Sequence, residues 1–387
     1  QAWVTKSVFS IRPYIKVPKN KYFEGIKPLI ILQRTLGRFP YSFNKHGFNP
    51  FKLLSFTTLY TVVFFSVQSA WTIYTMFVIA KLKIYNAPSY DEVLYWISIG
   101  LLLLLNFTTP ITKWIDARRH VQFVNSWQDF QVNYMKCELQ MTLAQPIKII
   151  AILILPAALV FMILETYLLN NLPFLVILPF VSAISAASTT LIHWCVTLYE
   201  LRVVSRHLLS KIIMNGCRQM SRYRRTWLEL SKLVSAVGEA HAYTGMMMSV
   251  IFFISIILST YTILSSLFES ETVSNNVWGL IMGAIIGFLC NFILYDAAYR
   301  TTQEVGPNFS SKILNLDLTH LSQGEINEIS LLIQTMSAHP PLIEYLGFVT
   351  INRNLFLSTI SNAVTYLVVL VQFKASSPMD ANNEEVQ

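Results

Sequence analysis

Long runs of apolar residues, separated by polar segments rich in lysine and arginine, dominate the pattern along this chain of 387 residues. A helix needs about 20 mainly apolar residues to cross a bilayer, and seven runs are long enough. The third and fourth runs are separated by only a few residues, which predicts an antiparallel helical hairpin. The seven predicted spans are Leu53–Ala80, Val93–Ile115, Ile147–Leu169, Leu172–Tyr199, Tyr243–Phe268, Val277–Tyr299 and Leu355–Phe373.

Helical periodicity continues beyond two of these spans. After the fourth span, apolar residues recur with helical spacing from Leu201 to Ile212, and before the fifth they recur from Trp227 to Val237. Both segments are too polar on their other faces to lie in a bilayer. We therefore predict that helices extend from the membrane over residues 201–242 and pack against each other there.

A capping-box pattern predicts a further short helix in the segment before the last span. Ser322 is followed three residues later by Glu325, and each side chain can accept a bond from the backbone N–H of the other residue. Apolar residues then recur on one helical face as far as Met336. We expect the helix to end at His339, because the two prolines that follow cannot continue a helix.

The composition agrees with a membrane protein and excludes several other classes. Hydrophobic residues make up 53% of the chain and charged residues only 13%, whereas soluble domains carry about 25% charged residues. Mean hydropathy is +0.48. These values exclude an ordinary cytosolic enzyme, a disordered chain and a disulfide scaffold. We predict an all-α, polytopic membrane protein with seven transmembrane helices.

The positions of the basic residues predict the orientation of the spans. The N-terminal segment and the loops that lie on its side of the membrane carry 24 lysines and arginines, and the other side carries three. Because basic loops stay in the cytoplasm, we expect a cytoplasmic N-terminus and an extracellular C-terminus, opposite to G-protein-coupled receptors. No basic stripe with interleaved aromatic residues stands apart from the spans, so we expect no nucleic-acid partner.

These assignments divide the chain into five segments. The predicted outer loops are short, so any ligand would bind among the first six helices. The segments are a cytoplasmic N-terminal segment (1–52), six transmembrane helices that form the ligand-binding domain (53–299, with cytoplasmic extensions at 201–242), a cytoplasmic anchor segment (300–354), a seventh helix (355–373) and an extracellular tail (374–387).

Patterns typical of enzymes or cofactor sites are missing from the sequence. It contains no phosphate-binding glycine loop, metal-ligand pair or nucleophile elbow, and its four cysteines lack zinc spacing. We expect no catalytic residue, cofactor or metal. We expect His193, in the fourth span, to be packed and hydrogen-bonded, with a proton relay as the alternative. We expect Asp296 to pair with Arg300 one turn later.

The last span carries its polar residues on one face. Residues separated by four, three, four and three positions form one stripe along a helix, and the opposite face is apolar. Either the stripe packs against other spans of the same chain, or copies of this helix face one another around an aqueous pore. In a pore, Val369 would be a hydrophobic constriction and Gln372 a polar ring. The stripe consists of Ser358, Asn362, Thr365, Val369 and Gln372.

The same span carries a resemblance to a known family. Thr365 and Tyr366, five hydrophobic residues, and then Gln372 and Phe373 resemble the Thr-Tyr and Gln-Phe signature of insect gustatory receptors. Seven spans, the predicted orientation and the short outer loops extend the resemblance over nearly the whole chain. Insect odorant receptors share this architecture, but their last helix lacks the pattern.

The resemblance implies a tetrameric, tastant-gated, non-selective cation channel, formed by this chain alone or with other gustatory receptor subunits. Four last helices would line a central pore, with Gln372 and Phe373 in the gate region and Thr365 and Tyr366 in the packing that couples it. Leu367 stands where receptors for sucrose and maltose tend to have Glu, so a fructose-like sugar or a bitter compound remains open. The alternative is a non-conducting or G-protein-coupled subunit that needs a partner.

Candidate ligand-binding residues lie in the halves of the spans that the predicted orientation turns outward. Small-ligand pockets combine aromatic walls with a few polar groups, although each aromatic residue alone also suits the membrane interface. Glu165 is either solvated at the boundary or directed into a cavity, where it could accept hydrogen bonds. The candidates are Gln68, Trp71, Tyr74, Tyr95, Trp96, Glu165, Tyr167, Ser182, Tyr261 and Trp278.

Overall fold

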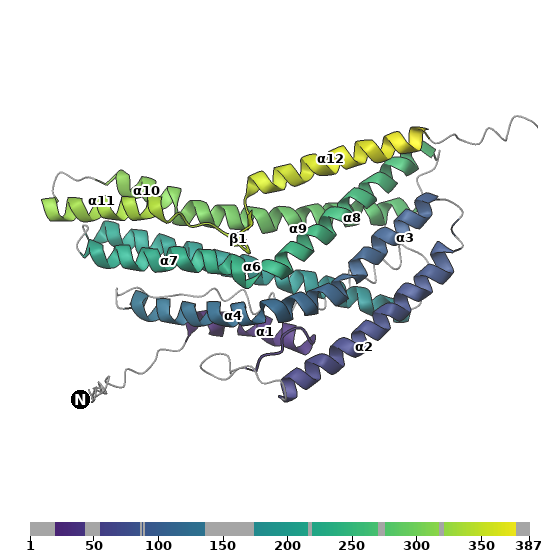
Figure 1. The fold of residues 1–387 in the computed structure, drawn as a ribbon, viewed down its shortest axis with the longest axis horizontal. Helices are drawn as coiled ribbons and strands as arrows, with labels where there is room; N and C mark the ends of the chain where they lie inside the picture. The colour runs from purple at the N-terminus through teal and green to yellow at the C-terminus, as the bar shows by residue number, and fades with distance from the viewer. Residues whose placement is uncertain are drawn as a thin grey trace, which may run out of the picture.

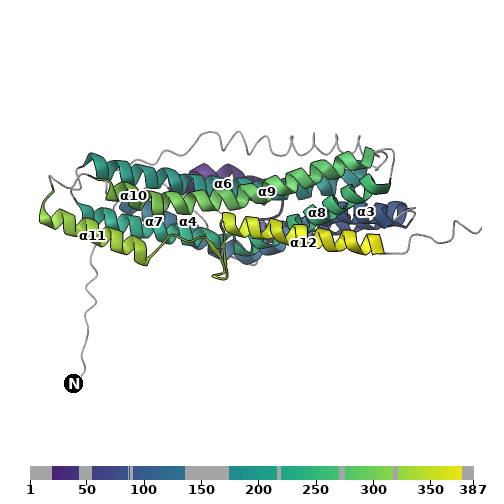
Figure 2. The same cartoon turned by 90° about the horizontal axis from the view of Figure 1, so that it is seen from above.

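The structure is a computed structural model. It describes residues 20–42, 55–85, 87, 90–135, 174–215, 219–269, 275–316 and 321–376. The third predicted span, Ile147–Leu169, lies outside these residues. The described chain is almost entirely helical, as predicted, and its helices run mainly along the long axis of an elongated molecule (Figures 1 and 2).

The described elements follow one another as helices with a single short hairpin before the last helix. Most of them correspond to predicted spans or to predicted extensions, whereas the first helix was not predicted. They are α1 (Lys21–Thr35), α2 (Phe56–Ile79) with a π-helical turn η1 (Ala80–Ile84), α3 (Tyr90–Leu103), α4 (Leu105–Met135), α6 (Phe174–Met214), α7 (Met220–Ala240), α8 (Ala242–Glu269), α9 (Asn275–Val305), α10 (Pro307–Leu314), α11 (Gln323–Ala338), β1 (Glu344–Tyr345), β2 (Val349–Thr350) and α12 (Arg353–Ser376).

Five helical stretches among the described residues are long and apolar enough to cross a membrane. They overlap the first, second, fourth, fifth and seventh predicted spans, and the sixth predicted span lies within α9. The stretches are Phe56–Ile84, Trp96–Tyr134, Val176–Met214, Ala242–Ser265 and Arg353–Gln372.

The second predicted span is formed by two helices rather than one. α3 and α4 meet at Leu104, whose carbonyl oxygen accepts backbone hydrogen bonds from Phe107 (3.0 Å) and Thr108 (2.9 Å). Pro110 follows in the next turn and has no N–H to continue the helical bonding pattern. The two helices therefore meet close to Pro110, where one helical backbone hydrogen bond cannot form.

The helix α11 confirms the capping-box prediction. The Ser322 hydroxyl accepts a hydrogen bond from the Glu325 backbone N–H (3.4 Å), and the Glu325 carboxylate accepts one from the Ser322 backbone N–H (2.9 Å). The helix ends at Ala338, directly before His339. Local sequence therefore determines both ends of this helix.

The largest apolar core fills the part of the molecule that contains α7, α10 and α11. It includes two completely buried tryptophans, Trp127 of α4 and Trp227 of α7. The Trp227 indole N–H donates to the carbonyl oxygen of Val305 (3.0 Å), and Tyr22 of α1 stacks on Trp127 with ring centres 4.2 Å apart. A smaller core around the buried Trp96 joins α2, α3 and α6.

A β-hairpin leads from α11 to α12 and is inserted against α7 and α8. Its turn contains Leu346 and Gly347, both with positive φ, as in the tight turns that suit the twist of β-hairpins. Gly238 lies against the backbone of Glu344, and Gly245 lies against the ring of Tyr345, so a Cβ atom at either glycine would clash with β1. The two glycines thus provide the space that holds the hairpin.

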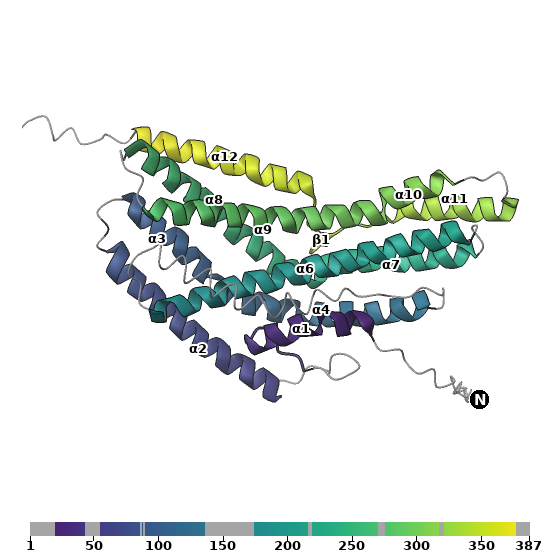
Figure 3. The same ribbon diagram turned by 180° about the vertical axis from the view of Figure 1, so that it is seen from behind.

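The last helix, α12, lies at one edge of the molecule (Figures 1 and 3). Only 6% of its most apolar stretch is buried, compared with 61% for the corresponding stretch of α6. Among the described helices, only α8 and α9 make substantial contact with α12. Most of its surface therefore remains available to other molecules.

Candidate pore helix and ligand site

The polar stripe on α12 faces away from the helices against which α12 packs. All five predicted stripe residues from Ser358 to Gln372 are exposed, whereas Ile360, Leu367 and Leu370 on the opposite face are half-buried. The stripe is therefore not buried against another described span of the same chain. Phe373 continues the helix, but its side chain lies outside the described residues.

Val364, which lies on the apolar face opposite the stripe, is not covered by α8 and α9. Its side chain is 55% exposed, although it also lines the hollow described next. The reason is geometric: α12 meets α8 and α9 along a narrow strip, so apolar residues at the edges of that strip remain uncovered. Only the centre of the predicted apolar face is covered.

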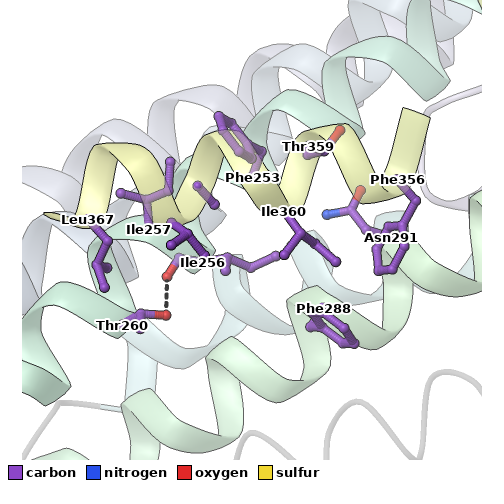
Figure 4. Close-up of a pocket in the computed structure, with 12 residues that line it drawn as sticks. Phe253, Ile256, Ile257, Thr260, Phe288, Asn291, Phe356, Thr359, Ile360 and Leu367 are labelled. Carbon is purple, nitrogen blue, oxygen red and sulfur yellow. Dashed lines mark hydrogen bonds between the residues drawn. The ribbon is translucent and has the colours of Figure 1, made fainter. Parts of the chain in front are cut away.

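A hollow of about 130 Å³ lies between α12 and the two helices α8 and α9 (Figure 4). Its lining is almost entirely apolar and includes Phe253 and Ile256 of α8, Phe288 of α9 and Ala363 of α12. Asn291 of α9 also lines it and is 2% exposed, yet neither amide atom of its side chain has a hydrogen-bond partner among the described residues. The hollow therefore combines apolar walls with one amide that can both donate and accept.

An ionic cluster holds the first turn of α12 against α9. The Asp296 carboxylate accepts hydrogen bonds from Arg353 Nε (2.9 Å) and forms an ion pair with Arg300 Nε (2.6 Å). The Arg353 guanidinium also lies over the ring of Tyr299, 4.4 Å from its centre. The predicted pair between Asp296 and Arg300 is confirmed, and Arg353 was missed because it lies far away in sequence.

Aromatic packing reinforces the same end of α12. Phe356 is buried, and its ring centre lies 5.3 Å from that of Phe288, 5.5 Å from Phe292 and 5.9 Å from Tyr295. These three partners all belong to α9. α12 is thus anchored near its start by charge and by aromatic contacts, while the hollow borders the following turns.

Two of the predicted ligand-binding residues lie together in a buried polar network. Gln68 of α2 donates through Nε2 to Ser182 of α6 (2.8 Å) and to Asn106 of α4 (2.7 Å). Asn106 in turn donates to the carbonyl oxygen of Pro179 (2.8 Å). The network joins three helices in their apolar interior and uses polar atoms that sequence reasoning assigned to a ligand.

Arg38, from the segment between α1 and α2, completes this network. Its guanidinium donates to the backbone carbonyl (2.7 Å) and the hydroxyl (2.9 Å) of Ser182. Arg38 is 1% exposed, and the Nε and Nη1 atoms of its guanidinium have no hydrogen-bond partner among the described residues. Sequence reasoning counted Arg38 only toward the orientation of the chain and did not identify it, or Asn106, as part of a site.

The other predicted ligand-binding residues with described side chains differ in burial. Trp96 and Tyr261 are buried, Trp71 is half-buried, and Tyr74 is 54% exposed. A predicted outward-facing pocket therefore remains a prediction. Four candidates have side chains outside the described residues, namely Tyr95, Glu165, Tyr167 and Trp278.

Comparison with known proteins identifies the family. The family described as "7tm Chemosensory receptor" matches residues 26–377. The chain belongs to this family. The receptor is 27% identical over 371 residues to gustatory and odorant receptor 24 of Anopheles gambiae, covering 92% of the receptor and 79% of that relative. It is 24% identical over 378 residues to gustatory and odorant receptor 21a of Drosophila melanogaster, covering 92% and 81%.

The fold of the receptor is similar to that of a solved insect olfactory receptor from Machilis hrabei in complex with eugenol. The TM-score is 0.61 at 14% identity, and the match covers 92% of the receptor and 99% of the olfactory receptor. The resemblance to gustatory receptors is thereby confirmed at the level of the family. The receptor is a multi-pass membrane chemoreceptor and belongs to a family of receptors rather than enzymes.

Proposed function

We propose that the receptor is a tastant-gated, non-selective cation channel, in which four copies of the chain surround a central pore lined by α12. The N-terminus is cytoplasmic and the C-terminus extracellular in this proposal, with the segment boundaries predicted above. The observation that carries the proposal is the outward exposure of the polar stripe on α12. The gustatory receptor signature lies on this same helix.

The energetic cost of polar groups in hydrocarbon supports the pore. Polar side chains within a membrane normally face protein or water. Asn362 and Gln372 are exposed in the middle and at the end of a membrane-length helix, and no described helix of the same chain covers them. If copies of α12 surround a water-filled axis, water would hydrate these side chains. The Val369 side chains of the copies would then form a narrow apolar ring in the pore.

The contacts of α12 suggest how the pore opens. Arg353 and Phe356 anchor the first turns of α12 to α9, whereas the hollow leaves the inner face free of close packing around Ala363. A helix held at one end and loosely packed beyond it can tilt about the held end. Tastant binding among the first six helices would change α8 and α9 and so shift this tilt.

The ligand in this proposal is a small organic tastant, either a fructose-like sugar or a bitter compound. The similar olfactory receptor holds eugenol, which is also a small organic molecule. Trp96 and Tyr261 provide buried aromatic surface near the predicted outer side. In the network around Gln68 and Ser182, the Oε1 atom of Gln68 has no hydrogen-bond partner among the described residues and could accept one from a ligand.

Whole-cell current from cells that express only this chain, with G-protein signalling blocked through the pipette, tests the proposal. Fructose, other sugars and a panel of bitter alkaloids are applied in turn. A rapid current with little discrimination among monovalent cations is expected. Silence to every compound, with surface expression confirmed, would instead favour a subunit that needs another gustatory receptor or a G protein. A reversal potential dominated by calcium would contradict the non-selective pore.

A further inference from the structure

Three histidines from separate parts of the chain meet in the interior of the receptor. His120 lies in α4, His193 in α6, and His241 at the junction of α7 and α8. They are 4%, 1% and 3% exposed. One ring nitrogen from each lies within 4.8 Å of those of the other two. Such a convergence of three buried imidazoles requires a physical explanation.

The spacing of the rings matches that of ligands around one metal ion. The ring centres are 4.9 Å apart for His120 and His193, 5.4 Å for His120 and His241, and 5.1 Å for His193 and His241. With a zinc–nitrogen bond of about 2 Å and tetrahedral angles, imidazole ring centres around one ion lie about 5 Å apart. The rings also stand at steep angles to one another, between 71° and 89°.

Hydrogen bonding leaves ring nitrogens available for a ligand. Among the described residues, neither nitrogen of His193 has a hydrogen-bond partner, and Nε2 of His241 has none. A buried polar atom without a hydrogen-bond partner destabilises a protein. If the three histidines were only packing residues, nothing would offset this destabilisation. Our expectation that His193 is hydrogen-bonded was wrong for the described residues.

We propose that His120, His193 and His241 form a binding site for Zn²⁺ in the interior of the receptor. Neutral imidazole is a preferred ligand of zinc, and three histidines leave a fourth tetrahedral position for water or another small ligand. The expectation from sequence that the chain holds no metal is not tested by the family comparison. The three ligands lie far apart along the chain, so no spacing motif could reveal them.

Two charged residues on α4 tune the affinity of this site. Lys113 is 6% exposed and lies close enough to interact electrostatically with all three histidines. Its positive charge opposes a divalent cation. Asp116 lies one turn further along α4 and partly offsets this charge, while its carboxylate accepts hydrogen bonds from the backbone N–H (2.9 Å) and hydroxyl (2.7 Å) of Thr244. We therefore expect a zinc affinity limited by Lys113.

The position of the site connects it to the segment that leads into α12. Trp194 packs edge-on against His241, with ring centres 5.7 Å apart, and also contacts Tyr345 of β1, at 6.0 Å. An ion at the site would join α4 and α6 to the corner between α7 and α8, with Trp194 between His241 and the hairpin. Metal binding does not depend on whether the receptor conducts ions.

Metal content and cobalt spectroscopy on the purified full chain, without a polyhistidine tag and in lipid nanodiscs, test the proposal. After removal of metals with a chelator, one equivalent of Zn²⁺ per chain is expected to bind. Co²⁺ is expected to give the visible absorption of a tetrahedral nitrogen site. If neither zinc binding nor cobalt absorption rises above background, the proposal is overturned.

Substitutions separate this site from adventitious binding. His193→Gln and His241→Gln are each expected to weaken zinc binding at least about tenfold, whereas His207→Gln, at an exposed histidine of α6, leaves it unchanged. Lys113→Met is expected to strengthen binding at least about fivefold, because a neighbouring positive charge is removed. Equal affinities in all four variants, with normal size-exclusion profiles, would show that zinc binds elsewhere and would overturn the assignment.

Discussion

The core around α7 and the edge formed by α12 are built on opposite principles. Around α7, large side chains such as Trp127 and Trp227 are completely buried, and the Trp227 indole N–H donates to Val305 of α9. Along α12, polar residues are exposed, and the inner face borders a hollow. The receptor therefore combines a densely packed support with a helix that is held mainly near Arg353 and Phe356.

The largest expected effect comes from damage to the densely packed support. Trp227→Ala removes a buried indole and its hydrogen bond to Val305, which is expected to destabilise the receptor by about 3–5 kcal/mol. Thermal unfolding in detergent and surface expression measure this loss. An alanine at the exposed Val369 is the matched comparison at the edge and is expected to leave the melting temperature nearly unchanged. Similar losses in both variants would abolish the distinction between core and edge.

The next effect concerns the anchor of α12. Asp296→Ala leaves Arg353 and Arg300 without their shared carboxylate. Because the guanidinium groups are about half exposed, we expect a cost of only about 1–2 kcal/mol. This cost corresponds to a shift of about fivefold to thirtyfold in the half-maximal agonist concentration. Current recordings over a concentration series measure the shift.

The control for the anchor is an ion pair of similar exposure that lies away from α12. Glu304 pairs with Arg206 at 3.1 Å, and the arginine side chain is 57% exposed. Glu304→Gln is expected to leave the agonist response within about twofold of the wild type. An equal shift in Asp296→Ala and Glu304→Gln would mean that the anchor of α12 has no special role.

A smaller effect is expected from filling the hollow. Ala363→Phe places a ring in a space of about 130 Å³ and would restrict movement of α12 toward α8 and α9. We expect a reduced maximal current with a nearly unchanged half-maximal agonist concentration, because ligand contacts stay intact. Ala363→Ser is the matched small substitution. A maximal current equal to that of the wild type would show that α12 does not move into the hollow.

Substitution in the polar stripe is expected to have the smallest effect on stability. Its effect on conduction is expected to be local to the pore. Gln372→Ala removes an exposed amide and is expected to change the melting temperature little while it alters single-channel conductance. Thr359→Ala, on the side of α12 that faces the hollow, is expected to leave conductance unchanged. The same conductance in both variants and the wild type would remove Gln372 from the pore.

Much of the fold could be predicted because it depends on local patterns. Span length and the capping box at Ser322 act over a few neighbouring residues, and the stripe on α12 follows from helical periodicity alone. The helix α1 was missed because Pro28 and scattered lysines obscure its amphipathic pattern. The break at Leu104 was missed because the apolar run continues through it.

The sites were less predictable because they depend on contacts between distant segments. The bond from Arg38 to Ser182, the ion pair between Asp296 and Arg353, and the three histidines all join residues that no spacing rule connects. Gln68 and Ser182 were predicted as ligand-binding candidates only from their expected depth in the membrane. Sequence reasoning could not show that their polar atoms bond to each other, because helix rotation depends on packing of the whole bundle.

The interruption at Leu104 separates two packing environments along one predicted membrane crossing. A substitution in α3 that reshapes the surroundings of Trp96 need not be transmitted as a rigid tilt to α4, whose residues Trp127 and His120 belong to the tightly packed interior. Such a joint would let the surroundings of Trp96 vary while the packing around Trp127 is preserved.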